Sequence, residues 1–167
     1  MNNREYMTLA LENAKKALGE GEVPVGAVIV CENKVIAQGY NKRETKRSAL
    51  SHAEIEAIDE ACRVLSSWRL AGCTMYVTLE PCPMCTGAII NAKLDRVVFG
   101  AYDEKAGCMG SLTNLTALPF NHCPSIVGGY MEKEAQALLT DFFEDLRSKK
   151  GAESKKLKFK KKIEKKY

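Results

Sequence analysis

The chain has 167 residues and a mass of 18.5 kDa, which suits one domain with a hydrophobic core. Its 46% apolar content excludes a globally disordered chain, and no apolar run reaches the roughly 18 residues of a membrane span. The formal net charge is +4, yet residues 148–167 alone carry +8, from ten lysines and two glutamates. Residues 1–147 therefore carry −4, and the basic excess belongs to the C-terminal segment.

Hydrophobic periodicity predicts helices that alternate with strands. In chain order we predict a helix over 4–18, a hairpin of strands over 25–31 and 35–40, a helix that begins near His52, a strand over 74–79, a helix over 83–91, a strand over 96–99, a short strand near 126–127 and a C-terminal helix from about residue 135. This order predicts an α/β fold, a single-domain three-layer α/β/α sandwich with a central mixed sheet. The segment 100–129 shows little periodicity, and we expect it to be functional because structureless loops of that length are uncommon in compact domains.

The charge pattern divides the chain into a domain over residues 1–147 and a lysine-rich tail over residues 148–167, which we expect to be flexible. Such a tail attracts anionic partners, for example nucleic acid, by long-range electrostatics. The alternative is a solvated terminus that aids solubility. Charge alone leaves both interpretations open.

Seven cysteines, an odd number, argue against a disulfide framework. Residues 1–5 lack the apolar core of a signal peptide, so we expect a protein of the reducing cytoplasm without a membrane partner. Most of the cysteines are expected to be small buried hydrophobes. Cys82 and Cys85 differ, because they form a C-x-x-C after Pro81, which is typical of a redox pair or of half a metal site.

Two segments, His52-Ala53-Glu54 and Pro81-Cys82-Pro83-Met84-Cys85, each fall where a helix is predicted to begin. One imidazole (His52) and two thiolates (Cys82, Cys85) suit Zn²⁺, and three protein ligands leave a fourth position for water, as in catalytic zinc sites. The positive ends of the two helix dipoles favour the thiolates. Glu54 lies two residues beyond the histidine, where its carboxylate can lean over the water and carry protons.

Simpler explanations exist for each part of this pattern. Ser51 and Glu54 match a capping box, in which the glutamate only satisfies a backbone N–H at the helix start. A lone C-x-x-C often has no connection with a metal site, and a lone H-x-E is even weaker evidence for one. The combination favours zinc. We interpret the adjacent pair His122-Cys123 as a loop feature, because neighbouring residues rarely converge on one metal.

This H-x-E and P-C-x-x-C signature resembles that of the zinc-dependent cytidine and nucleobase deaminases. The resemblance to one family among them, the bacterial tRNA-specific adenosine deaminases, covers roughly residues 4–147. The segments that carry it are Val23-Pro24-Val25-Gly26-Ala27-Val28, Gly39-Tyr40-Asn41, Leu79-Glu80-Pro81-Cys82-Pro83-Met84-Cys85, Val97-Val98-Phe99-Gly100-Ala101-Tyr102-Asp103, Lys105-Ala106-Gly107, Gly110-Ser111-Leu112, Asn121-His122 and Asp141-Phe142-Phe143.

The resemblance implies hydrolytic deamination of adenosine to inosine at the wobble position of a tRNA anticodon. It implies one Zn²⁺ per subunit on His52, Cys82 and Cys85, with zinc-activated water and Glu54 as the catalytic proton shuttle. It further implies a homodimer and a tRNA anticodon stem-loop as partner, and no nucleotide cofactor. The substrate-binding residues it implies are Asn41, Asp103, Lys105, Asn121 and Phe143.

Two of these carried-over residues also have plain structural interpretations. Asn41 follows a predicted strand, where an asparagine often caps a turn. Phe143 falls at helical spacing, where an aromatic is often part of the core, although Phe142 is the better core candidate.

Two other functions remain open from the sequence. One is a guanine, cytosine or nucleotide deaminase with the same zinc core; the lysine-rich tail and the segment 103–105 favour RNA over it, because a free-base enzyme has no need of a basic surface for a polyanion. The other is a catalytically silent, deaminase-like RNA-binding module with structural zinc. An intact Glu54 beside only three protein ligands argues against that module, because structural zinc sites are usually closed by four ligands.

Overall fold

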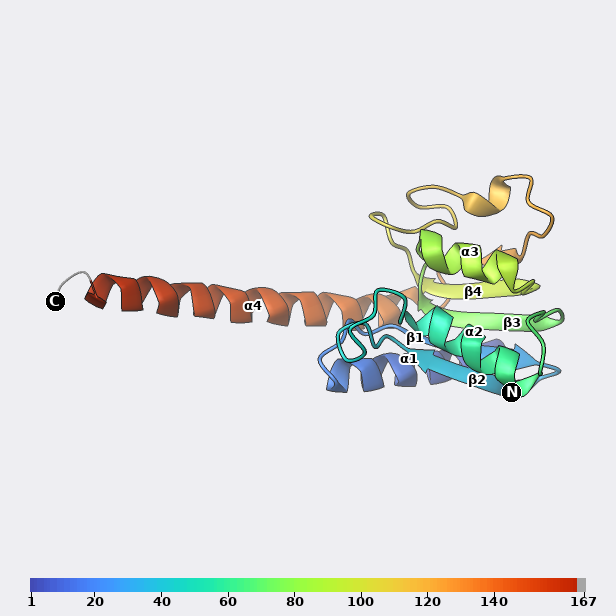
Figure 1. The fold of residues 1–167 in the computed structure, drawn as a ribbon, viewed down its shortest axis with the longest axis horizontal. Helices are drawn as coiled ribbons and strands as arrows, with labels where there is room; N and C mark the ends of the chain where they lie inside the picture. Colours follow the sequence, from blue (N-terminus) through green and yellow to red (C-terminus); the bar gives the residue numbers. More distant parts are fainter. Residues whose placement is uncertain (165–167) are drawn as a thin grey trace.

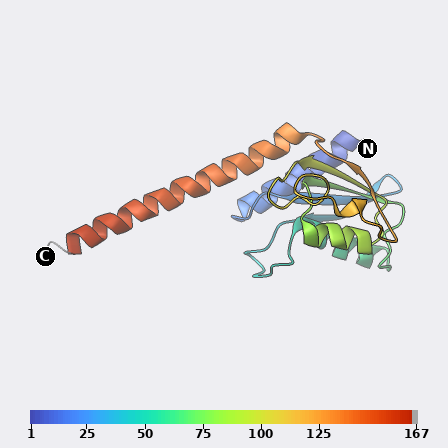
Figure 2. The ribbon, with the colours of Figure 1, turned by 90° about the horizontal axis from the view of Figure 1, so that it is seen from above.

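Three layers make up the fold in the computed structural model, which describes residues 1–164. A five-stranded sheet forms the middle layer, with α1 and α4 on one face and α2 and α3 on the other (Figure 1 and Figure 2). The elements are α1 Asn3–Gly19, β1 Gly26–Cys31, β2 Lys34–Tyr40, α2 Ala53–Val64, β3 Cys73–Leu79, α3 Pro83–Asn91, β4 Arg96–Ala101, the 3-10 turn η1 Leu115–Ala117, β5 Ser125–Val127 and α4 Glu132–Glu164. The predicted α/β/α sandwich with a mixed sheet is confirmed.

The strand order in the sheet is β2-β1-β3-β4-β5. Strand β1 is antiparallel to both β2 and β3, whereas β3, β4 and β5 are parallel to one another. Because β1 alone runs the other way, the C-terminal ends of β2, β3, β4 and β5 all meet at one edge of the sheet. We call it the carboxyl edge. Helices α2, α3 and α4 all begin at this edge, after loops that follow β2, β3 and β5.

Local sequence signals explain where several elements begin and turn. Helix α1 starts with a capping box, in which the Asn2 side chain accepts from the Glu5 N–H at 3.1 Å and the Glu5 carboxylate accepts from the Asn2 N–H at 2.7 Å. The hairpin between β1 and β2 turns at Glu32 and Asn33, both at positive φ (48° and 61°), as a tight two-residue turn requires. Pro83 opens α3, where its missing N–H costs nothing.

The core lies on both faces of the sheet, around its three central strands. Val28, Ile29, Met75, Val77 and Val97 are fully buried, as expected for strands that are covered by helices on both sides. Within residues 1–164, no helix has both the length and the hydrophobicity needed to cross a bilayer.

The largest departure from the predicted elements concerns the C-terminal helix. It begins at Glu132 and continues to Glu164, so it includes most of the segment predicted as a flexible tail; residues 165–167 lie outside the described residues. Its first turns are anchored by buried Ala135 and Leu139, and the helix then leaves the domain (Figure 1). A single exposed helix can fray, so the flexibility of the tail and the domain boundary stay predictions.

The segment 100–129 is irregular, as predicted, but it is held in place. It contains η1, an isolated bridge between Met109 and Asn114, and β5 at its end. Strand β4 also runs two residues further than predicted, to Ala101, which pairs with Leu79 of β3.

A close contact between β2 and α2 makes Gly39 necessary. A Cβ at this position would lie 2.3 Å from the Ala53 carbonyl oxygen and 2.7 Å from the Ala57 nitrogen, so Gly39→Ala must push α2 away from the sheet. We expect it to lower the free energy of unfolding by about 1–3 kcal/mol in denaturant titrations. Gly87→Ala is the matched control, because its Cβ would meet no atom within 4 Å and alanine favours the helix by about 0.5–1 kcal/mol. Equal stabilities for the two variants would contradict this account.

Candidate functional site

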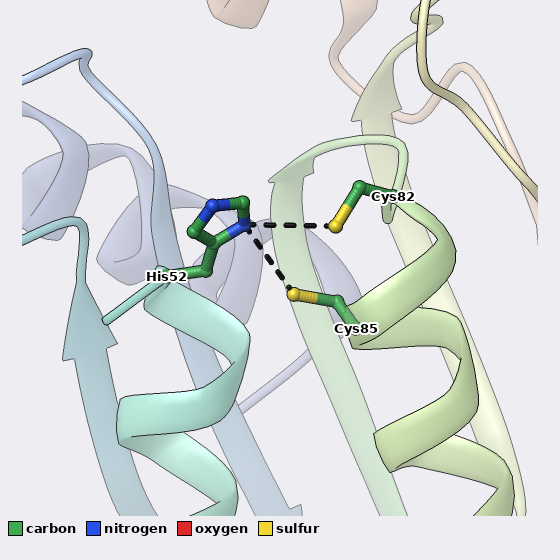
Figure 3. Close-up of side chains that lie close together, drawn as sticks. All are labelled: His52, Cys82 and Cys85. Atoms are coloured by element: carbon green, nitrogen blue, oxygen red, sulfur yellow. Dashed lines mark hydrogen bonds between the residues drawn. The ribbon is translucent and has the colours of Figure 1, made fainter. Parts of the chain in front are cut away.

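The N-termini of α2 and α3 lie side by side at the carboxyl edge and carry the predicted metal ligands. His52 and Cys82 are the N-cap residues of the two helices, and neither side chain makes a capping hydrogen bond. Instead they turn toward each other, and Cys85, in the first turn of α3, points into the same space (Figure 3). The two segments singled out in the sequence therefore converge, 30 residues apart along the chain.

The distances within this group fit a tetrahedral zinc site. The His52 Nδ1 atom lies 3.6 Å from the Sγ atom of Cys82 and 3.6 Å from that of Cys85, and all three ligand atoms lie within 4.8 Å of one another. Zinc bonds of about 2.0–2.1 Å to nitrogen and about 2.3 Å to sulfur, at a tetrahedral angle, separate those two ligand atoms by about 3.6 Å. The group is therefore consistent with the zinc site of a deaminase. Among residues 1–164 it is the one such group of three or more potential ligands.

Charge in this group is concentrated on one sulfur. Hydrogen bonds from the Cys85 thiol and from His52 lower the pKa of Cys82 to about 4, although burial opposes the shift. The same contact with Cys82 raises the pKa of His52 and also that of Cys85. The N-terminus of α3 adds a positive dipole end beside the thiolate. The site thus favours an anionic sulfur at Cys82, and the thiolate is the form of cysteine that binds a metal ion.

Glu54 lies beside this group in the first turn of α2 and is almost fully buried, with 4% of its surface exposed. Burial raises its pKa to about 7, and the charge of Cys82 adds to the increase. The capping-box explanation is wrong, because α2 begins at Ala53 with His52 as N-cap and no side-chain cap. A buried carboxyl with a pKa near neutrality can both accept and donate a proton at neutral pH.

A cavity of about 150 Å³ opens in front of these residues. Its lining comes from the part of the carboxyl edge between β2 and β4: Val23, Val25, Asn41, Arg43, His52, Ala53, Glu54, Leu79, Glu80, Cys82, Asp103 and Ala106. One wall is the loop after β2 and the other is the loop after β4. We call them the 41–50 loop and the 102–111 loop.

Two of the predicted substrate-binding residues line the cavity, one on each wall. The Asn41 amide oxygen accepts from the Arg43 N–H at 3.2 Å and its amide nitrogen donates to the Val23 carbonyl at 3.3 Å, so this side chain caps a turn as well as facing the cavity. The Asp103 carboxylate accepts from the N–H groups of Lys105 and Ala106, at 3.0 and 3.2 Å, and so shapes its own loop.

The other predicted contacts lie outside the cavity wall. Lys105 is exposed at the tip of the 102–111 loop, Asn121 is exposed before β5, and Phe143 is 42% exposed on α4. An RNA is far larger than the cavity, so their roles stay predictions. The His122 ring contacts the Leu94 carbonyl and the Cys123 thiol donates to a backbone carbonyl, as expected for a loop feature.

Sequence reasoning missed Arg43 and Glu80 as cavity-lining residues. Arg43 belongs to a loop recognised only as polar and basic, and nothing local indicates that its loop folds over the metal ligands. Glu80 directly precedes Pro81 in a segment that carries the resemblance, but it had no predicted role.

The α/β/α sandwich and the group of potential metal ligands beside Glu54 together identify the class of protein. Two helix N-termini that bring together an imidazole and two thiols, with a buried carboxylate beside them at one cavity, are characteristic of zinc-dependent deaminases with the cytidine deaminase-like fold.

Comparisons with known proteins narrow the class to a family. The model of the MafB19-like deaminase family matches residues 1–147. The tRNA-specific adenosine deaminase of Bacillus subtilis (strain 168) is 50% identical over 153 residues, which cover 91% of this chain and 95% of that protein. This chain belongs to the MafB19-like deaminase family.

Solved structures agree with this assignment. A structure from studies of A-to-I editing by tRNA:A34 deaminases at the wobble position matches with a TM-score of 0.78 and 38% identity, covering 82% of this chain and 100% of that one. The guanine deaminase of Bacillus subtilis matches with a TM-score of 0.60 and 39% identity, over 61% of this chain and 66% of that one.

Replacement of one thiol tests the ligand set. We expect Cys82→Ser to reduce bound zinc from about one ion per chain to a small fraction, because the site loses a ligand and its most acidic thiol. Zinc is measured by elemental analysis of the dialysed protein. Cys123→Ser is the control, because this exposed thiol contacts only the backbone of its own loop, and it should retain full zinc content. Unchanged zinc in Cys82→Ser would rule out the proposed ligands.

Proposed function

We propose that this protein hydrolytically deaminates adenosine to inosine at the wobble position of tRNA anticodons. The observation that carries the proposal is the meeting of the three potential zinc ligands with a buried carboxyl, Glu54, at one cavity. The choice of substrate is supported by 50% identity to a protein named a tRNA-specific adenosine deaminase and by the likeness to a tRNA:A34 deaminase structure.

In this proposal His52, Cys82 and Cys85 hold one zinc ion per subunit. Zinc bound by three protein ligands keeps one position open for water and lowers the pKa of that water toward about 7.

Glu54 is the proton carrier in the proposed reaction. It accepts a proton from the water that attacks C6 of adenine, donates it to N1 of the ring, and then assists the departure of ammonia. The overall reaction consumes one water and yields inosine and ammonia. Its raised pKa, about 7, supports this role, because a proton carrier works best when its pKa is near the operating pH.

The cavity walls bind the target nucleoside in this proposal. Asn41 on the 41–50 loop and Asp103 on the 102–111 loop face the cavity from opposite sides. The volume of about 150 Å³ suits a single base turned out of its loop, rather than a stack of paired bases. Lys42, Arg43 and Lys105 provide positive charge near the mouth for the flanking phosphates.

We also propose a homodimer. What supports it is the number of large apolar side chains left exposed between β4 and β5 and after α2. Examples are Leu112, Leu118, Phe120 and Trp68, which are 49–59% exposed.

A substrate panel tests the proposed activity. The full-length, zinc-loaded protein is incubated with total tRNA, adenosine, guanine and cytosine, and both inosine in RNA and released ammonia are measured. Inosine confined to the wobble base of a tRNA is the expected result. Ammonia from guanine without inosine in RNA would instead establish a free-base deaminase, and tRNA binding without any turnover would establish a silent module.

Glu54→Gln tests the proton carrier. We expect the variant to keep its zinc and to lose about 10²- to 10⁴-fold in turnover, because an amide of the same size cannot accept the proton. Turnover is measured as inosine formed per minute at saturating tRNA, with zinc content as the second measurement. Asp59→Asn, an exposed acidic residue on the same helix, should leave both unchanged. Near-native turnover in zinc-replete Glu54→Gln would exclude this role.

We further propose that the exposed part of α4 strengthens tRNA binding. Its lysines extend from the domain at the carboxyl edge, the same edge as the cavity, so a bound anticodon stem-loop and the helix share one side of the molecule (Figure 1). The acidic domain, at −4, gives little long-range attraction by itself.

Charge removal without loss of helix tests this binding surface. Lys158, Lys160, Lys161 and Lys162 are replaced together by glutamine, which has a similar helix propensity. We expect tRNA affinity to fall and the slope of log Kobs against log salt to become shallower by about 0.7–0.9 for each phosphate that the variant no longer neutralises, as measured by filter binding at several salt concentrations. Lys15→Gln with Lys34→Gln, on exposed positions of α1 and β2, is the control. An unchanged slope would return the tail to the role of a solvated terminus.

A further inference from the structure

Two buried glutamates, Glu22 and Glu80, lie beside the cavity and take no part in the proposed chemistry. Each is only 1% exposed. Burial of a carboxylate costs several kcal/mol unless the group is well hydrogen-bonded or paired. The donors that satisfy these two carboxylates come from the loops that form the two cavity walls.

Glu80 holds the 102–111 loop. Its Oε2 atom accepts from the Asp103 N–H at 3.0 Å and from the Ser111 hydroxyl, and its Oε1 atom accepts from the N–H groups of Met109 and Ser111, both at 3.0 Å. The loop wraps the carboxylate so closely that a Cβ at Gly107 would lie 2.4 Å from the Glu80 Cδ atom. Four donors from both ends of one loop thus converge on a side chain fixed at the end of β3.

Glu22 holds the 41–50 loop in a similar way. Its Oε1 atom accepts from the Thr45 N–H at 2.6 Å and from the Thr45 hydroxyl at 2.9 Å, and its Oε2 atom accepts from the Glu44 N–H at 3.2 Å. The next residue, Val23, lines the cavity and accepts a hydrogen bond from Asn41. Glu22 therefore fixes the outer part of the loop whose base faces the cavity.

We infer that Glu80 and Glu22 are positioning residues for the deamination site, each of which holds one wall of the cavity at the distance that the substrate needs. The inference rests on the proposed function for its substrate. It adds that two buried carboxylates hold the walls of the cavity in position. Neither wall contains a helix or a named strand, and the regular pairing of the 102–111 loop is limited to the isolated bridge between Met109 and Asn114. A carboxylate is suited to the task because it only accepts hydrogen bonds and can take several backbone donors at once.

Fixed walls matter because a catalytic geometry must be maintained within about 0.5 Å to remain productive. Asp103 of one wall donates its N–H directly to Glu80, and Arg43 of the other wall directly precedes the Glu44 and Thr45 donors. A movement of either loop therefore moves a cavity-lining residue.

Glu80→Gln tests the inference with almost no change in side-chain size. An amide has one acceptor oxygen, and its NH₂ group faces N–H donors where the second oxygen was, so about half of the hydrogen bonds are removed. We expect kcat/KM for a tRNA anticodon stem-loop to fall at least about tenfold at a temperature where the variant is fully folded, with zinc content unchanged. We also expect faster amide hydrogen exchange in residues 102–111, measured by mass spectrometry.

Glu22→Gln gives the reciprocal test. It should speed exchange in the 41–50 loop and leave the 102–111 loop unchanged, whereas Glu80→Gln should do the opposite. Tyr76→Phe is the matched control, because it removes a buried hydroxyl that donates to Asn3 at 2.6 Å, outside the cavity lining. This control should keep kcat/KM within about twofold of the wild type. If Glu80→Gln does not fold, Ser111→Ala removes one of the four donors and should show a smaller change in the same two measurements.

The outcomes separate this inference from the proposed function. Local, loop-specific changes in exchange together with reduced kcat/KM support the positioning roles. The positioning roles are overturned if kcat/KM of Glu80→Gln stays within twofold of the wild type. They are also overturned if amide exchange in the variants rises equally across the sheet. If the wild-type protein forms no inosine in tRNA, the proposed function fails, and the exchange pattern alone then decides whether the two glutamates hold the walls.

Discussion

The common direction of four strands is the constraint to which the other features of this structure can be traced. Because β1 alone is reversed, β2, β3, β4 and β5 all end at the carboxyl edge. Helices that follow β2 and β3 must then begin next to each other, so His52 and Cys82 become neighbours although 30 residues separate them. Open α/β sheets in general bind ligands at the carboxyl ends of their strands. Here that edge carries the three potential zinc ligands, the buried Glu54, both cavity walls and the start of α4.

Three buried glutamates at this edge differ in how their surroundings act on the carboxyl group. For Glu54 burial prevails, and its pKa rises to about 7. For Glu22 burial also raises the pKa, but hydrogen bonds from Thr45 and Glu44 outweigh it, and the pKa lies below its ordinary value. Glu80 accepts four hydrogen bonds from one loop. A buried carboxyl whose pKa is raised toward neutrality suits the proton transfer proposed for Glu54, whereas carboxylates that accept several hydrogen bonds suit the holding of loops proposed for Glu22 and Glu80.

The net charge differs in sign between residues 1–147 and the lysine-rich tail. Residues 1–147 carry a net charge of −4, whereas the exposed part of α4 carries most of the basic excess. Among the α4 residues whose exposure is described, the buried ones are Ala135 and Leu139 in the first turns, so Lys149–Lys162 are exposed.

Local signals in the sequence were sufficient for most of the elements and for the α/β/α class, because helix caps and strand periodicity act over a few residues. Pro83 and the turn at Glu32 and Asn33 are examples whose conformational preferences do not depend on distant residues. The H-x-E and P-C-x-x-C segments also indicated the group of potential zinc ligands that the fold brings together, whereas the role of Glu54 stays a prediction. The resemblance also indicated Asn41 and Asp103, which do line the cavity.

The further residues that form the walls, and the groups that hold them, emerged from the three-dimensional arrangement alone. Arg43, Glu22 and Glu80 gain their roles from loops without periodicity, whose paths are set by hydrogen bonds between residues 22 to 31 positions apart. Phe143 lies on α4 and is absent from the cavity lining, and this too follows from the path of the helix and not from a local pattern. Such long-range contacts form only when the strands have assembled, and no local pattern encodes them.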